Sequence, residues 1–187
     1  MVTSAGQALL LLDPTVGTVR PTGAFARRMD PDTDFDRLVD RMRTALRAAR
    51  KAAVPVVWVV PGAAFIQRMS GRVPSPDEVR PDEIVGTPAA GEPVVEKTEI
   101  GAFAGTDLES ILRASGVGEI VLAGVATQYV VAATAREGSD RGFSVRILND
   151  ACADVDAQTH VRTLEELRAI ATIGSTVEDW ADLAAHD

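Results

Sequence analysis

The chain has 187 residues, of which 46% are hydrophobic and 25% charged, proportions typical of a soluble globular protein that needs no disulfide or structural metal to fold. Its formal net charge of −8 argues against nucleic acid or an acidic membrane surface as a partner, because both attract basic proteins. A single cysteine excludes an internal disulfide, and two histidines argue against a zinc site with several ligands.

Short apolar runs alternate with amphipathic segments along the chain. The first run, residues 8–12, ends at Asp13, and its uninterrupted hydrophobicity is typical of a strand buried on both faces. Residues 35–49 repeat apolar side chains every three or four positions behind a capping Thr33 or Asp34, which predicts a helix. In chain order we expect strands at residues 8–12, 54–60, 94–97, 119–123, 143–148 and 171–173, and helices at residues 35–49, 107–115, 129–140, 156–170 and 176–184.

Two segments rich in proline and glycine, residues 14–32 and 61–92, read as loops. The second is too long for a plain connection, and such loops often act as functional lids. No apolar stretch approaches the roughly 20 residues of a membrane span, and no basic segment precedes the first apolar run. We therefore expect a cytoplasmic protein that does not bind membranes.

Strands that alternate with helices predict an α/β fold of three layers, α/β/α, with a parallel sheet of about six strands in one domain spanning residues 1–187. Ligands of such folds bind beyond the carboxyl ends of the strands. Asp13 follows the first strand, Lys97 ends the third, and residues 124–127 follow the fourth. An acid and a base at separate strand ends form either a catalytic pair or a structural ion pair.

Four segments in this order, at matching spacing, resemble the isochorismatase-like hydrolase superfamily, which also contains nicotinamidases and related amidases. They are Leu11-Leu12-Asp13, residues 95–97 with 102–108, residues 121–127 with 133–135 and 142–143, and residues 149–153. The resemblance covers nearly the whole chain. It implies the strand order 3-2-1-4-5-6, which brings Asp13 to the turn at residues 124–130, and a cis peptide between Val125 and Ala126.

The resemblance also shows where this chain departs from its relatives. The usual mechanism uses a cysteine nucleophile, with the Asp as its base, and here that position is Val130, which has no nucleophilic atom. The only cysteine, Cys152, is expected to be a buried structural thiol. The metal-binding Asp-x-His of nicotinamidases is absent, because the chain reads Asp13-Pro14-Thr15. We therefore expect no metal and no other cofactor.

Two hypotheses about function remain open. Isochorismatases proper need no cysteine, because their Asp is thought to protonate a vinyl ether, and Asp13 with Lys97 could support a reaction of that kind. Those enzymes follow the Lys with Trp-Arg-Tyr-Ser, whereas here Glu99 stands in place of the Arg, so isochorismate with its two carboxylates is a poor candidate substrate. The alternative is a catalytically inactive member of the family that binds a small molecule or a protein.

The expected site has three groups of residues. We expect Asp13 and Lys97 to be catalytic, with Lys97 holding Asp13 ionised at rest. The turn residues, including those that would form an oxyanion hole, are Val125, Ala126 and Val130. Residues expected to contact a small-molecule substrate are Thr15, Glu99, Phe103, Gln128 and Tyr129.

The long loop at residues 61–92 also predicts assembly. By resemblance we expect a homo-oligomer, a dimer or tetramer, in which this loop reaches a neighbouring subunit. Sedimentation at micromolar concentration that detects only a 19.7 kDa species would contradict this expectation.

Overall fold

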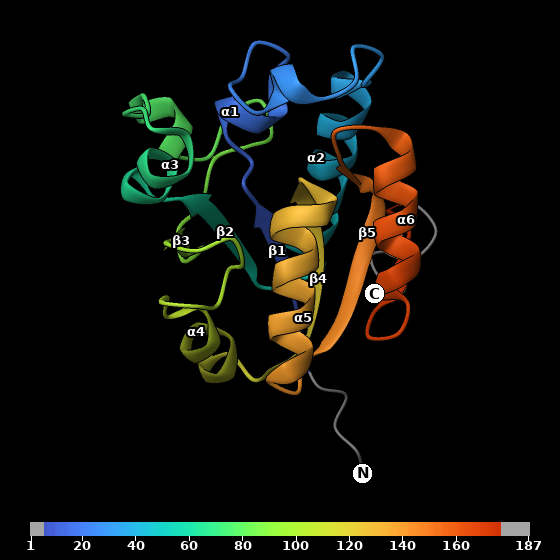
Figure 1. Ribbon diagram of the computed structural model, residues 1–187. Helices are drawn as coiled ribbons and strands as arrows, with labels where there is room; N and C mark the ends of the chain where they lie inside the picture. Colours follow the sequence, from blue (N-terminus) through green and yellow to red (C-terminus); the bar gives the residue numbers. More distant parts are fainter. Residues whose placement is uncertain (1–5, 177–187) are drawn as a thin grey trace.

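The computed structural model describes residues 6–176. Its sheet has six strands, all paired in parallel, in the order β3-β2-β1-β4-β5-β6 (Figure 1). The strands are β1 Gly6–Leu12, β2 Val56–Pro61, β3 Val94–Lys97, β4 Val117–Val125, β5 Ser144–Ala153 and β6 Thr172–Gly174. The α/β fold class and the strand order predicted from the sequence are confirmed.

The central strand β1 explains why the sheet needs helices on both faces. It lies between β2 and β4, and its last five residues are buried. Leu9 and Leu11 belong to one hydrophobic cluster, whereas Leu10 and Leu12 belong to the other. Successive side chains of a strand point to opposite faces, so an uninterrupted apolar run supplies both cores at once.

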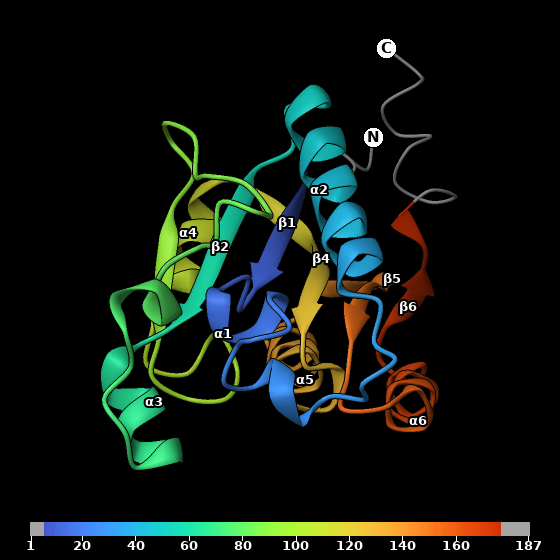
Figure 2. The same cartoon turned by 90° about the horizontal axis from the view of Figure 1, so that it is seen from above.

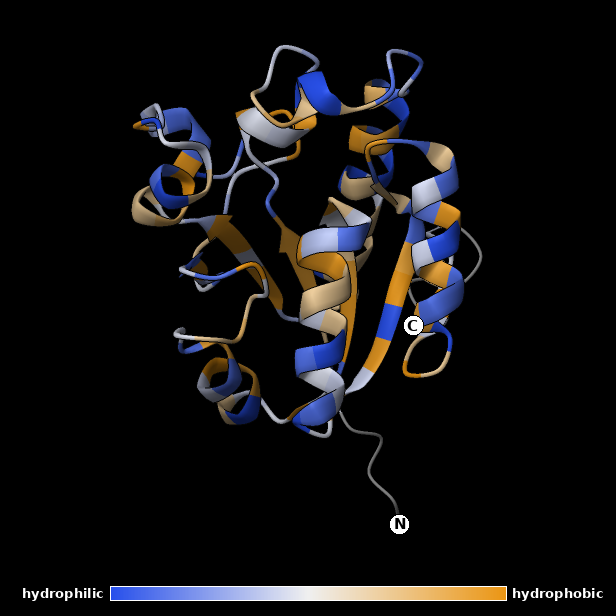
Figure 3. Ribbon diagram, viewed as in Figure 1, coloured by the Kyte–Doolittle hydropathy of each residue, from blue (hydrophilic) through white to orange (hydrophobic). Residues whose placement is uncertain are grey.

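Helices cover the two faces unequally. On one face lies α2, Phe35–Lys51 (Figure 2). It begins where the Asp34 carboxylate accepts a hydrogen bond from the Arg37 N–H at 2.9 Å. The other face is covered by α4 Leu108–Ala114, α5 Ala132–Asp140 and α6 Ala157–Leu167. Figure 3 shows hydrophobic strands between helices that carry hydrophilic residues as well. Within residues 6–176, no helix combines the length and the apolarity needed to cross a bilayer.

Both segments predicted as loops contain short helical elements. These are α1 Val16–Val19, the 3₁₀ turn η1 Ala26–Arg28, α3 Ala63–Ser70 and the 3₁₀ turn η2 Pro76–Val79. Only α3 reaches eight residues. Its apolar residues Phe65, Ile66 and Met69 recur at helical spacing, but none of its residues is buried, and the flanking Gly62 and Gly71 favour a loop when the sequence is read alone.

Other boundaries differ by a few residues. Thr106, which the sequence suggests as the cap of α4, precedes the observed N-cap, Asp107. The Thr106 hydroxyl nevertheless accepts a hydrogen bond from the Leu108 N–H at 3.3 Å. Residues Thr127–Val131 form a π-helix, η3, that leads into α5. Strand β5 continues to Ala153 because its register with β4 shifts between Leu122 and Gly124, after which pairing resumes. The helix predicted at residues 176–184 lies almost entirely outside the described residues.

Candidate active site

The structure brings Asp13 and Lys97 together across the strand that separates them. Asp13 directly follows β1, where its N–H donates a hydrogen bond to the Val59 carbonyl at 2.8 Å, and its φ of 52° lies in the left-handed region. Lys97 is the last residue of β3. The Lys97 Nζ lies 3.3 Å from the Asp13 Oδ2, and the two side chains are 2% and 11% exposed. The two residues therefore form a buried ion pair at the carboxyl edge of the sheet.

The ammonium of Lys97 has two further contacts. It donates a hydrogen bond to the Glu99 carbonyl at 3.2 Å and lies 4.0 Å from the centroid of the Phe65 ring. A cation over an aromatic face is attracted by the ring, and more strongly where water is excluded. These contacts fix the ammonium beside the carboxylate.

Burial controls the protonation of Asp13. Desolvation raises its pKa to about 6, and the charge and hydrogen bond of Lys97 only partly oppose that rise. From the sequence we expected the charge of Lys97 to control the pKa of Asp13. In the structure, the free-energy cost of desolvating the carboxylate exceeds the gain from its pairing with Lys97. The Asp13 Oδ1 is buried and has no hydrogen-bond partner among the described residues. Asp13 therefore changes its protonation close to neutral pH and keeps one acceptor oxygen unused.

This raised pKa predicts a characteristic pH dependence of stability. The folded-state pKa of about 6 exceeds the ordinary 3.8, so the stability that Asp13 contributes is complete below pH 3.8 and is lost as the pH rises through about 6. Two units of pKa correspond to about 3 kcal/mol. In urea unfolding, the wild type should therefore lose about 3 kcal/mol relative to Asp13→Asn between about pH 4 and pH 8. Parallel pH curves for the two proteins would show that the Asp13 carboxyl is not dehydrated.

A cavity of about 490 Å³ opens over the ion pair. A volume of this size is typical of small-molecule sites. The residues expected from the sequence that line it are Asp13, Thr15, Lys97, Val125, Ala126, Tyr129 and Val130. The peptide between Val125 and Ala126 is cis, as the resemblance implies. Val130, where the resemblance implies the nucleophile, is buried in the wall.

Three residues expected to contact substrate do not line this cavity. The Glu99 carboxylate forms an exposed ion pair with Arg68 at 2.9 Å. Phe103 packs in the core against Phe143, with ring centroids 5.7 Å apart. Gln128 is bound through its backbone and side-chain nitrogens to Asp154, at 2.5 and 2.8 Å.

The two segments predicted as loops supply cavity residues that the sequence did not reveal. Phe25 and Arg28 come from the first, and Phe65, Arg72 and Glu78 come from the second. Arg72 binds the Glu78 carboxylate through two hydrogen bonds, at 2.5 and 2.9 Å, which lower the pKa of Glu78 to about 2. The unusual length of the second loop indicated a functional segment, but it did not predict which of its side chains line the cavity.

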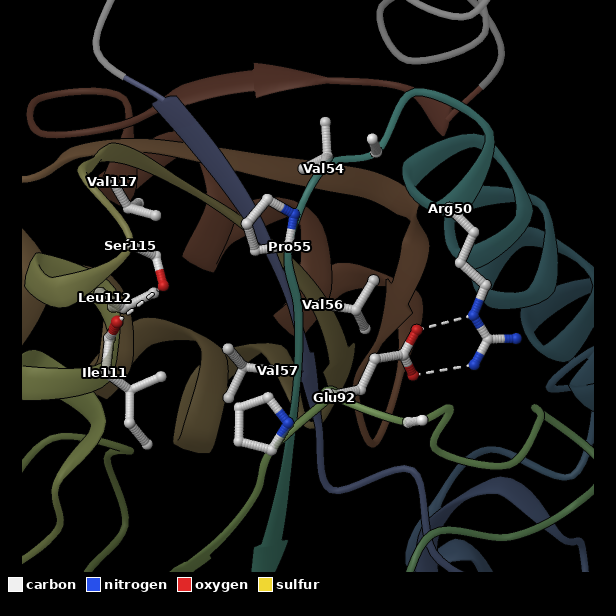
Figure 4. Close-up of a pocket in the computed structure, with 14 residues that line it drawn as sticks. Arg50, Val54, Pro55, Val56, Val57, Glu92, Ile111, Leu112, Ser115 and Val117 are labelled. Carbon is white, nitrogen blue, oxygen red and sulfur yellow. Dashed lines mark hydrogen bonds and ion pairs between the residues drawn. The ribbon is translucent and has the colours of Figure 1, made fainter.

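A second hollow, of about 640 Å³, lies at the opposite edge of the sheet, where β2 and β4 begin (Figure 4). Its two charged side chains are Arg50 and Glu92, which neutralise each other through hydrogen bonds of 2.7 and 2.8 Å. Glu92 also accepts a hydrogen bond from the Trp58 indole at 2.8 Å. Both oxygens of Glu92 accept hydrogen bonds and its pKa is lowered to about 2, so Glu92 does not exchange a proton near neutral pH, unlike Asp13.

Two other side chains with reactive groups, Cys152 and His160, do not line the cavity above Asp13. Cys152 is buried, and desolvation raises the pKa of its thiol to about 12, so the thiolate is scarce at neutral pH. The His160 Nδ1 lies 2.8 Å from the Thr127 hydroxyl, and burial lowers the pKa of this histidine. Within residues 6–176, no group of three or more His, Cys, Asp or Glu side chains is arranged to hold a metal ion.

Comparisons with known proteins agree with this architecture. Residues 7–182 match the isochorismatase domain. The uncharacterized isochorismatase family protein YecD of Escherichia coli O157:H7 is 33% identical over 141 residues, which cover 71% of this chain and 75% of that protein. A streptothricin hydrolase of Streptomyces noursei is 34% identical over 180 residues, 94% of this chain but only 59% of its own length. The N-carbamoylsarcosine amidase of Thermoplasma acidophilum superposes with a TM-score of 0.75 at 26% identity, covering 92% of this chain and 98% of that one.

Proposed function

Because the chain belongs to the isochorismatase family, we propose that it is a hydrolase of a small molecule that uses Asp13 and Lys97 and no cysteine nucleophile. The observation that carries this proposal is the buried Asp13 carboxyl, which lines the cavity with one oxygen unpartnered and a pKa of about 6. A group with such a pKa can either give or take a proton near neutral pH.

Lys97 suits a partner of this carboxyl in acid–base chemistry. If Asp13 protonates the terminal carbon of a vinyl ether, the carboxylate that remains is stabilised by the ammonium 3.3 Å away. Water then adds to the resulting oxocarbenium ion and returns a proton to Asp13. The hemiacetal or hemiketal formed breaks down to a carbonyl compound and an alcohol, so the net reaction consumes one water.

The absence of a suitable thiol supports a route without a covalent thioester. Val130, where the resemblance implies the nucleophile, lines the cavity, and Cys152 is not among the residues that line it. The alternative function, a catalytically inactive protein that binds a small molecule or a protein, is favoured by the same valine. Turnover separates the two hypotheses.

A substrate panel tests the proposal directly. The wild type, Asp13→Asn and the control Asp140→Asn, at the exposed end of α5, are compared on vinyl ethers, amides and cyclic ureas. We expect the wild type to hydrolyse at least one class and Asp13→Asn to lose about 10²- to 10⁴-fold in rate, the usual contribution of a general acid or base. Full activity in Asp13→Asn would refute the acid–base role, and the absence of all turnover would favour the binding module.

The pH–rate profile then identifies which role Asp13 plays. A general acid must be protonated, so kcat/KM should fall tenfold per pH unit above about 6. A general base must be ionised, so kcat/KM should instead rise through the same pH and level off above it. A profile that is flat between about pH 5 and pH 8 would exclude both roles.

A further inference from the structure

The charges that line the cavity do not balance. Five of its lining residues are charged, three cations and two carboxylates. Asp13 pairs with Lys97, and Glu78 pairs with Arg72. Arg28 is the remaining cation, and no carboxylate of the described residues lies within ion-pair distance of it. While Asp13 is ionised, the cavity of a chain with a net charge of −8 therefore presents one uncompensated positive charge.

Aromatic contacts hold Arg28 at the cavity. It is the last residue of η1, and its guanidinium lies 5.6 Å from the centroid of the Phe25 ring. The Phe25 ring meets the Tyr129 ring edge-on, with centroids 6.2 Å apart. The segment between α1 and α2 that carries these residues lies beside the start of α5 (Figure 2). A guanidinium attracted to a ring keeps its N–H groups directed outward in its own plane, so Arg28 can bind a ligand.

We propose that this cavity takes a small molecule with a single carboxylate, and that Arg28 binds the carboxylate. The inference rests on the proposed function, because it treats the cavity as the substrate site. Lys97 cannot take this part, since its ammonium already contacts Asp13, the Glu99 carbonyl and the Phe65 ring. Glu99 does not oppose an anion here, because its own carboxylate is paired with Arg68 outside the cavity.

The surroundings favour a carboxylate over a phosphate and an apolar body over a polar one. A planar carboxylate matches the guanidinium with two parallel hydrogen bonds, and its one charge neutralises the one excess charge of the wall. While Asp13 is ionised, a phosphate dianion would leave one excess negative charge beside the carboxylates of Asp13 and Glu78. The apolar lining, Phe25, Phe65, Ile66, Met69 and Tyr129, would contact the rest of the molecule.

Three probes of similar shape test this inference: benzoate, its neutral analogue benzamide, and the dianion phenyl phosphate. Dissociation constants are measured by ligand-observed NMR titration on the wild type, Arg28→Gln and the matched control Arg27→Gln. Arg27 is also exposed, lies next in the same turn, and does not line the cavity. Both Arg28 and Arg27 are on the surface, so neither substitution should impair folding, which thermal unfolding verifies.

We expect the wild type and Arg27→Gln to bind benzoate about tenfold or more tightly than benzamide, because a hydrogen-bonded charge pair contributes more than a neutral one. Arg28→Gln should lose this preference, and Arg28→Lys should recover part of it. The inference is overturned if Arg28→Gln keeps the preference, if benzamide or phenyl phosphate binds the wild type as tightly as benzoate, or if benzoate shows no saturable binding.

Failure of the proposed function is read separately, from turnover. If the protein hydrolyses part of the panel through Asp13 but shows no preference for benzoate, only the proposed role of Arg28 is wrong. If the protein prefers benzoate through Arg28 but hydrolyses no member of the panel, only the proposed hydrolase function is wrong.

Discussion

Lys97→Met is expected to raise the pKa of Asp13 well above about 6 and to slow the reaction by about a hundredfold or more. In the wild type, the charge and hydrogen bond of Lys97 are what oppose the desolvation of the Asp13 carboxyl. Methionine resembles lysine in length but brings no charge, so desolvation acts unopposed. The pH at which kcat/KM changes should therefore move upward, while the maximal rate falls because the carboxylate formed during reaction has lost its cation.

Lys97→Arg is the matched variant, because it keeps the positive charge. In Lys97→Arg, the pH at which kcat/KM changes should stay near that of the wild type, even if the larger head group lowers the rate. Titration of the Asp13 carboxyl by carbon-13 NMR measures the same shift without a substrate. If Lys97→Met leaves both the NMR titration and the pH dependence of kcat/KM unchanged, the ion pair does not control Asp13 and the proposed role of Lys97 is wrong.

Val130→Cys is expected to create a thiol that reacts at least about a hundredfold faster than Cys152 with a small alkylating reagent. Val130 lines the cavity, within the helical segment 127–140, whose amino end favours a thiolate. Cys152 is buried, and its pKa of about 12 leaves almost no thiolate at neutral pH. Val130 is buried as well, but it lines the cavity, and a thiol there with an ordinary pKa near 8.5 gives roughly a thousandfold more thiolate, only partly offset by its lower intrinsic nucleophilicity.

Val131→Cys is the control for this experiment. Val131 is the adjacent valine, is fully buried, and belongs to the hydrophobic core without lining the cavity. Mass spectrometry locates the adduct, and an activated ester tests whether the new thiol also supports acyl transfer beside Asp13. A folded Val130→Cys protein that reacts no faster than Val131→Cys would show that the cavity has been reshaped at this position and not merely deprived of its nucleophile.

Much of the fold could be predicted because it follows from periodicity. An apolar run such as residues 8–12 is buried on both faces only when helices cover both faces of the sheet. The alternation of strands and helices predicts that the sheet is parallel. The same logic located Asp13 and Lys97, since both stand at the carboxyl ends of strands that the sheet brings to one edge. Their positions depend on strand order and not on the details of loops.

The rest of the cavity depends on contacts between loops, which carry no periodic signal. Arg28 lies at the cavity beside Phe25, whose ring contacts Tyr129 of η3. Glu99 pairs with Arg68 of α3, a short helix that its flanking glycines, Gly62 and Gly71, made read as part of a loop. In both cases a side chain's direction is set by a partner distant in sequence, and neither partner's position follows from local pattern.

The left-handed backbone of Asp13, with its φ of 52°, has a consequence for how this position responds to mutation. This conformation costs most L-residues roughly 1–2 kcal/mol, is tolerated best by asparagine and aspartate, and costs glycine nothing. Alanine would therefore disturb the backbone and the chemistry together, whereas asparagine changes the chemistry alone. Asparagine and glycine are each a single nucleotide from aspartate. In a library selected only for folding, codon 13 should drift toward these two residues, and in one selected for turnover it should remain aspartate.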